Sequence, residues 1–135
     1  MFSVQKKQMK RNTYLLLGII ISSFILLLIL TIKAEATYAD ADDLMHYLYA
    51  RYSPKYPQFL LDHWGKPLFT LIATPFAQFG HIGMRLMNVF FALLTGYFEY
   101  KISSTLGYKE PWLAIILILF SPIFLMLSLS GNIEV

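Results

Sequence analysis

The sequence predicts an all-α integral membrane protein with three transmembrane helices. Only 14% of its 135 residues are charged, whereas a soluble domain carries about 25%. Its mean hydropathy is +0.57. Two segments each run 19 residues without a charge, which at about 1.5 Å per residue is close to the ~30 Å hydrocarbon core of a bilayer. A chain with so few polar residues cannot cover the core of a soluble protein with a polar surface.

The net charge of +3 does not indicate a nucleic-acid partner, because the basic residues form no stripe interleaved with aromatic side chains. Four of the eleven lie together in the N-terminal tail: Lys6, Lys7, Lys10 and Arg11. The chain has no cysteine. A disulfide framework and a thiolate metal site are therefore excluded.

The first predicted span covers residues 14–32. The basic tail that precedes it places the N-terminus in the cytoplasm, since Lys and Arg are in excess on that side of membranes. A signal peptide is the alternative, because the small residues Ala34 and Ala36 flank Glu35 in a pattern similar to a cleavage site. The apolar run is longer than the usual apolar region of about 7–15 residues in signal peptides, and this length favours a span.

An outer loop over residues 33–82 is predicted to carry two juxtamembrane amphipathic helices. The first begins at about Asp40, where helical spacing puts Asp42 and His46 on one face. The same spacing puts Asp43 and Tyr47 together on a neighbouring face. The Ser53-Pro54 pair ends this helix, because the residue before a proline is disfavoured in the α region.

The second helix of the loop begins at Lys66-Pro67, since proline is favoured in the first turn of a helix. At about 14 residues, with Pro75 interrupting it, the segment is too short to span and is expected at the membrane interface. Two more spans are predicted over residues 83–100 and 111–129, the last kinked at Pro122.

The resulting topology has the N-terminus in the cytoplasm and both the loop and the C-terminus outside. We therefore expect residues 1–135 to form a single membrane domain. A bundle of three helices with polar residues at several ends is poorly self-contained, so we expect this domain to be the N-terminal part of a longer membrane protein.

The clustered carboxylates Asp42 and Asp43 allow two interpretations. They could be solvated loop residues that cap the following helix. Alternatively, two carboxylates near lipid could raise each other's pKa, so that one of them acts as a general base. They could also hold a divalent cation together with His46. Three histidines spread over 35 residues form no recognisable zinc motif.

The cations Lys66 and Arg85 also allow two interpretations. Both could be interface anchors whose long stems reach the head groups, or both could bind the phosphate of a lipid. Glu134 follows the third predicted span and should return to the same face as Asp42. It is either a terminal acid or a second acid of the same site.

In this order the motifs resemble the start of membrane glycosyltransferases of the GT-C superfamily, in the branch of protein O-mannosyltransferases and lipid A aminoarabinose transferases. Asp42-Asp43 stands where the family has an Asp-Glu pair in the first outer loop. Trp64-Gly65-Lys66-Pro67 is similar to its Lys-Pro motif, with Leu68 in place of a second proline. Further similarities are Arg85-Leu86 entering a span and the Ser130-Gly131-Asn132-Ile133-Glu134 segment.

The resemblance implies transfer of a sugar from a polyprenyl-phosphate donor to a lipid, glycan or protein acceptor on the outer face of the membrane, with inversion at the anomeric carbon. Asp42 would be the general base, and Lys66 and Arg85 would stabilise the departing phosphate. The expected location is the cell (inner) membrane of a prokaryote. The full set of predicted substrate- and phosphate-binding residues is Asp43, His46, Tyr47, His63, Trp64, Lys66, Arg85 and Glu134.

Two other functions fit the same features. One is a small non-enzymatic membrane protein whose polar loop docks a partner. The other is a fragment of a transporter or flippase that holds lipid phosphate through Lys66 and Arg85 without chemistry.

Overall fold

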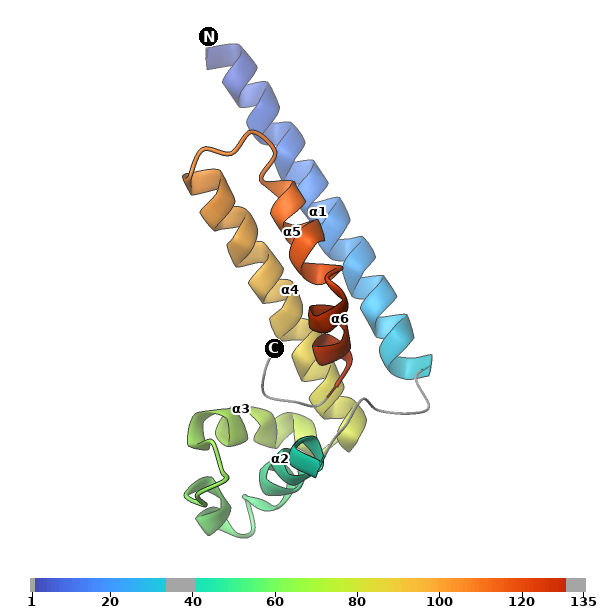
Figure 1. Ribbon diagram of the computed structural model, residues 1–135, viewed down its shortest axis with the longest axis vertical. Helices are drawn as coiled ribbons and strands as arrows, with labels where there is room; N and C mark the ends of the chain where they lie inside the picture. Colours follow the sequence, from blue (N-terminus) through green and yellow to red (C-terminus); the bar gives the residue numbers. More distant parts are fainter. Residues whose placement is uncertain (1, 34–40, 131–135) are drawn as a thin grey trace.

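The computed structural model describes residues 2–33 and 41–130, and within these ranges the regular structure is helical, with no β-strand (Figure 1). In chain order, the elements are α1 (Phe2–Lys33), α2 (Ala41–Tyr52), the 3-10 helix η1 (Pro57–Leu60), α3 (Pro67–Ala77), α4 (His81–Thr105), α5 (Trp112–Leu119) and α6 (Pro122–Leu129). The predicted helical class is confirmed.

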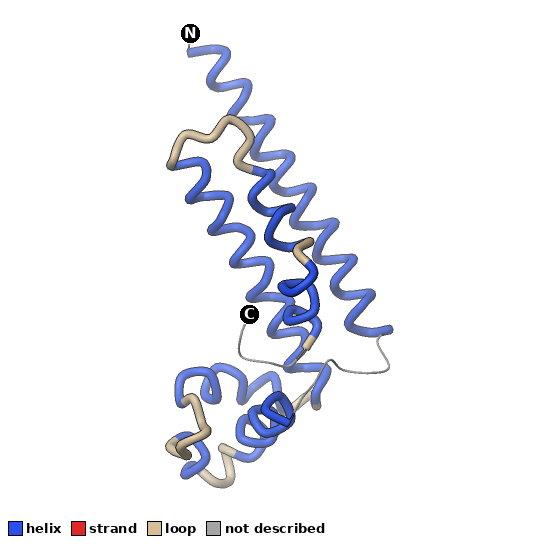
Figure 2. The backbone as a smooth tube through the Cα atoms, in the orientation of Figure 1, coloured by secondary structure: helices blue, strands red, loops and turns tan. Residues whose placement is uncertain are grey.

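Helices α1 and α4 and the consecutive pair α5–α6 lie along one another as an elongated bundle (Figures 1 and 2). The buried residues of α1 recur about every fourth or seventh position and so form one stripe: Asn12, Leu16, Ser23, Leu27 and Thr31. The other faces of α1 expose large apolar side chains, among them Leu17, Ile21, Phe24 and Ile25. Such an exposed apolar surface is typical of a membrane or protein contact.

In the described part of the chain, α1 is the one unbroken helix that is long and apolar enough to cross a membrane, over Arg11–Lys33. Helices α5 and α6 meet this criterion only as a pair, with a bend of 68° between them. The predicted kink at Pro122 is confirmed, since this proline begins α6. The structure thus contains one candidate span and one broken candidate.

Helix α4 corresponds to the second predicted span and has 25 residues. It is not among the helices apolar enough to cross on their own, because Arg85 lies near its start and Glu99 and Lys101 lie near its end. The count of three transmembrane helices therefore remains a prediction.

Helices α2, η1 and α3 form a separate layer at the end of the bundle where α1 ends and α4 begins (Figure 1). Arg51 joins the two main helices of this layer: its Nη1 donates to the Ala77 carbonyl at 3.0 Å, and Gln78 Nε2 donates to the Arg51 carbonyl at 3.2 Å. The expected interruption at Pro75 is wrong, because α3 continues through this residue to Ala77.

Buried polar side chains hold the start of α4 to the end of α6. Arg85 Nε donates to the Leu129 carbonyl at 2.9 Å, and Asn88 Nδ2 donates to the Ser130 carbonyl at 2.9 Å. The carbonyls at the end of a helix have no partner within the helix, so these two bonds satisfy groups that would otherwise lie buried and unpaired. The loop layer, the start of α4 and the end of α6 consequently lie at one end of the molecule, as the sequence predicted.

Candidate functional site

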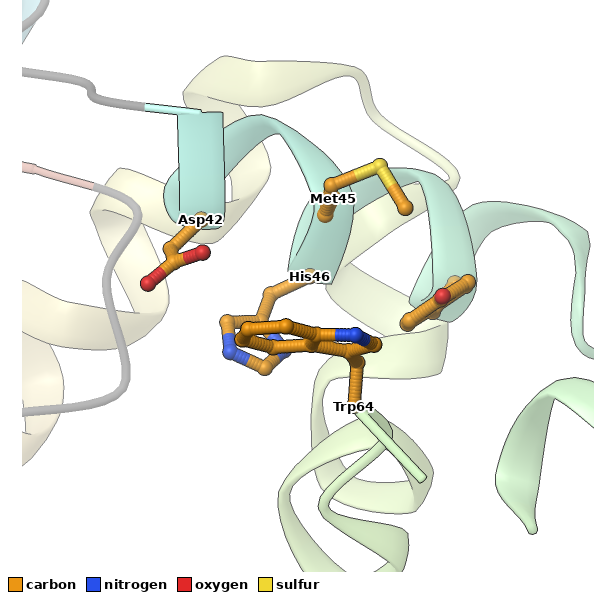
Figure 3. A pocket seen from close by; sticks show the side chains of 5 residues that line it. Asp42, Met45, His46 and Trp64 are labelled. Atoms are coloured by element: carbon orange, nitrogen blue, oxygen red, sulfur yellow. The ribbon is translucent and has the colours of Figure 1, made fainter. Parts of the chain in front are cut away.

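A pocket of about 190 Å³ lies between α2 and the turn that precedes α3 (Figure 3). Its lining residues are Asp42, Met45, His46, Tyr49 and Trp64. The four from α2 are spaced at i, i+3, i+4 and i+7, which puts them on one face of a helix. The predicted common face of Asp42 and His46 is thus confirmed.

Asp42 and Trp64 lie at the accessible side of this pocket. Asp42 is exposed in the first turn of α2, His46 is buried one turn later, and the Trp64 indole, 59% exposed, extends from the facing turn toward them (Figure 3). The pocket therefore presents a carboxylate, an imidazole and two aromatic rings to a ligand. At about 190 Å³ it is smaller than the roughly 300–1,000 Å³ of pockets that enclose a whole small molecule, so it can hold one ring of a ligand.

The turn Asp62–Gly65 positions Trp64. The Trp64 backbone N–H donates to Asp62 Oδ1 at 3.0 Å, and the Gly65 N–H donates to the Asp62 carbonyl at 2.8 Å. A Cβ at Gly65 would lie 2.8 Å from the Phe59 carbonyl oxygen, too close for any other residue. Asp62 was absent from the predicted site, although Asp at the first position and Gly at the fourth are typical of a β-turn.

Tyr49 connects the pocket to this turn, since its hydroxyl donates to Asp62 Oδ1 at 3.1 Å. Burial raises the pKa of Tyr49, and the hydrogen bond and charge of Asp62 raise it further. The backbone N–H of Trp64 lowers the pKa of Asp62, and Tyr49 and His63 contribute in the same direction against the effect of burial. At neutral pH, Tyr49 is therefore a neutral donor and Asp62 a charged acceptor.

Because the folded pKa of Asp62 is below its ordinary value of about 4, its ionised form stabilises the turn above that pH. This stabilisation is lost as the pH falls through the lowered folded pKa. In a Trp112→Phe background, we expect the Trp64 emission to show a transition below about pH 4.

The variant Asp62→Asn cannot ionise, so its emission should lack this acid transition. Lys55→Gln, an exposed change outside the pocket, should retain it. A wild-type emission without a transition between about pH 4 and pH 2 would show that Asp62 does not hold the turn.

Asp43 and Tyr47 face α4 instead of the pocket. Asp43 is fully buried, and its Oδ1 lies 3.4 Å from Nε2 of His81 at the start of α4. The Tyr47 ring packs edge-on against the same histidine, with 5.6 Å between ring centroids. Their predicted common face is confirmed, and in the structure this face joins α2 to α4. Neither residue lines the pocket.

The other predicted site residues do not line the pocket either. His63 is exposed, with its Nδ1 3.5 Å from Asp62 Oδ1. Lys66 is exposed directly before α3, and Arg85 is buried against the end of α6. Glu134 lies outside the described residues.

The predicted cation set of Asp42, Asp43 and His46 is not brought together. Across residues 2–33 and 41–130, the structure contains no group of three histidines or carboxylates that could hold a metal ion. Successive residues of a helix are rotated by about 100° around its axis, and Asp43 consequently points toward His81 while Asp42 points into the pocket.

Comparison with known proteins found no matching family model, no similar curated protein and no similar solved structure. The function is therefore inferred from the residues and geometry of this chain. A carboxylate beside aromatic rings is suited to a hydroxylated ring, because the rings pack against its C–H face while the carboxylate accepts a hydroxyl proton.

Proposed function

We propose that this chain is the N-terminal membrane part of a GT-C-type glycosyltransferase that uses a polyprenyl-phosphate sugar donor. The observation that carries the proposal is the position of Asp42, the predicted base, in an accessible pocket shared with His46 and Trp64 (Figure 3). The order of the motifs along the sequence supports the same proposal. The part of the pocket that this chain provides is large enough for one sugar ring.

In the proposed reaction, Asp42 takes the proton of an acceptor hydroxyl. The acceptor oxygen then attacks the anomeric carbon from the face opposite the phosphate, and the bond from that carbon to the phosphate oxygen breaks. The lipid phosphate leaves with the bonding electron pair, and the sugar is inverted. A positioned general base contributes about 10²–10⁴-fold to such a rate.

Lys66 remains the proposed cation for the leaving phosphate, since it is exposed directly before α3, two residues after the pocket residue Trp64. Arg85 is buried and donates to the Leu129 carbonyl. We therefore propose that Arg85 supports the site by holding the start of α4 to the end of α6. No divalent cation is required for the proton transfer described above.

In the proposed membrane arrangement, α1, α4 and the pair α5–α6 all cross the bilayer. The polar ends of α4 then lie at the two interfaces, where charged side chains cost less than at the bilayer centre. Helices α2 and α3 lie on the outer surface, with the exposed Trp64 and Leu68 at head-group depth.

A transfer assay tests the proposal. Membranes that contain the natural protein with this chain are given radiolabelled polyprenyl-phosphate mannose or aminoarabinose. We expect label on a lipid, glycan or protein acceptor only in membranes that contain the protein. Label that stays on the donor but crosses the membrane would identify a flippase. If neither transfer nor movement occurs with any polyprenyl-phosphate sugar, the proposal is wrong.

A further inference from the structure

Most of the groups that line the pocket of Asp42 attract positive charge. Asp42 contributes a carboxylate, and Met45 contributes a thioether sulfur, which is a weak acceptor. Trp64 and Tyr49 contribute aromatic rings, whose faces carry the negative part of the ring quadrupole. Among the residues that the structure describes, no lysine or arginine lines this pocket. The electrostatics of the lining therefore favour a cation.

A second carboxylate, that of Asp62, lies behind the two aromatic residues. Its Oδ1 accepts the Tyr49 hydroxyl at 3.1 Å and the Trp64 backbone N–H at 3.0 Å. The Trp64 N–H is the main cause of the lowered pKa of Asp62, so this carboxylate is charged at neutral pH. The same two hydrogen bonds hold the two aromatic residues in place before a ligand arrives. A site that is already ordered loses less conformational freedom on binding.

The chemistry of the pocket limits the cation to an organic ammonium group. The described part of the chain contains no group of three histidines or carboxylates that could hold a metal ion. An ammonium group is instead bound by the face of an aromatic ring, and tryptophan is the strongest of the aromatic side chains in this role. Figure 3 shows the Trp64 indole extending toward α2, with Asp42 and Met45 on the α2 side of the same opening.

Exposed groups beside the pocket indicate that the ammonium belongs to a lipid. Trp64 and Leu68 are exposed in the layer next to the end of the candidate span α1 (Figure 1). Tryptophan is enriched at head-group depth in membranes. Lys66 lies between these two residues in the sequence and is exposed as well, and a lysine at this depth attracts phosphate. A head group with both an ammonium and a phosphate matches this arrangement.

We propose that the pocket of Asp42 binds the head group of phosphatidylethanolamine from the leaflet next to α2 and α3. The ammonium donates to the Asp42 carboxylate and lies against the Trp64 indole, and the phosphate lies beside Lys66. The inference concerns the same pocket as the proposed function but does not depend on sugar transfer. Where both hold, the head group covers Asp42 until an acceptor displaces it.

Native mass spectrometry of the purified chain tests this inference, with phosphatidylethanolamine and phosphatidylglycerol as the probes. Both lipids carry a phosphate and can be given the same acyl chains, but only phosphatidylethanolamine has an ammonium group. We expect it to bind more tightly than phosphatidylglycerol. The preference, measured as the ratio of the two dissociation constants, should fall about fivefold in Trp64→Leu and in Asp42→Asn, which each remove one exposed cation–π contact or ion pair.

Two matched controls change residues outside the pocket. Phe79→Leu removes an exposed aromatic ring directly after α3, and Glu99→Gln makes the carboxylate-to-amide change in α4. Each should change the preference less than twofold, and helical circular dichroism checks that every variant is folded.

Tighter binding of phosphatidylglycerol by the unmodified chain would overturn the proposal, and so would a preference that is unchanged in Trp64→Leu or in Asp42→Asn. Equal weakening of both lipids by Trp64→Leu would show that the indole is only an apolar anchor and would overturn it as well. The assay contains no sugar donor, so its result is independent of the transfer assay.

Discussion

Replacing Asp42 with Asn in the natural protein is expected to slow sugar transfer by about 10²–10⁴-fold, the contribution of a positioned general base. The amide has nearly the shape of the carboxylate but cannot take the acceptor proton. Since Asp42 is exposed and no contact in the described part of the chain depends on its charge, the variant should be folded and expressed normally. The transfer assay with radiolabelled donor measures the effect.

The matched control for this variant is Glu99→Gln, which makes the same carboxylate-to-amide change in the last third of α4, away from the pocket. It should transfer sugar at close to the normal rate. Normal transfer by Asp42→Asn at normal expression would refute the assignment of the base. Equal losses in both variants would point to a general effect of charge.

Replacing Gly83 with Ala is expected to destabilise the corner between α3 and α4 by about 3 kcal/mol, the upper part of the range for overpacking a core. A Cβ at Gly83 would lie 2.0 Å from the Phe76 carbonyl oxygen. Because that atom belongs to the backbone, no side-chain rotation can relieve the clash, and α3 must move away from α4. The shift displaces the layer that carries the pocket.

Thermal unfolding of the detergent-solubilised chain, followed by tryptophan emission, measures this loss. Gly18→Ala is the matched control, since a Cβ there meets no atom within 4 Å and alanine favours the helix by about 1 kcal/mol over glycine. We expect Gly18→Ala to keep or raise the unfolding temperature. An unfolding temperature for Gly83→Ala as high as that of the wild type would contradict the close approach of the two helices.

The elements that sequence predicted well are those fixed by local signals. A charge-free run of 19 residues is long enough for a span by itself, and α1 includes all of it. Helix α2 was expected over residues 40–52 and is found at Ala41–Tyr52, because helical periodicity and Pro54 both act within a few residues. The break before Pro122 likewise follows from one proline.

The partners of polar side chains were not predictable, because they come from distant parts of the chain. Asp43 and Arg85 were assigned to substrate and phosphate binding by the resemblance to GT-C glycosyltransferases. The structure gives each of them a contact between helices, to His81 and to the Leu129 carbonyl. A contact with another helix lowers the free-energy cost of burying a charged side chain. The spacing of residues in the sequence does not distinguish such a contact from binding of a substrate.

The irregular part of the loop was the hardest to interpret. His63, Trp64 and Lys66 are nearly adjacent and were placed in one site, but only Trp64 lines the pocket. Side chains of a turn point in directions set by its backbone bonds, here those of Asp62 and Gly65. The sequence contained the residues of this turn, but not the Tyr49 contact that joins it to α2.

The central claim is that the layer of α2 and α3 lies outside the membrane while the connection from α4 to α5 lies in the cytoplasm. Because the chain has no cysteine, single cysteines can be placed at the exposed positions Leu61 and Leu106, and no other thiol in the chain reacts with the label. Labelling of intact cells with a membrane-impermeant maleimide should modify Leu61→Cys at once and Leu106→Cys only after permeabilisation. The reverse pattern, or equal labelling of both before permeabilisation, would contradict the account.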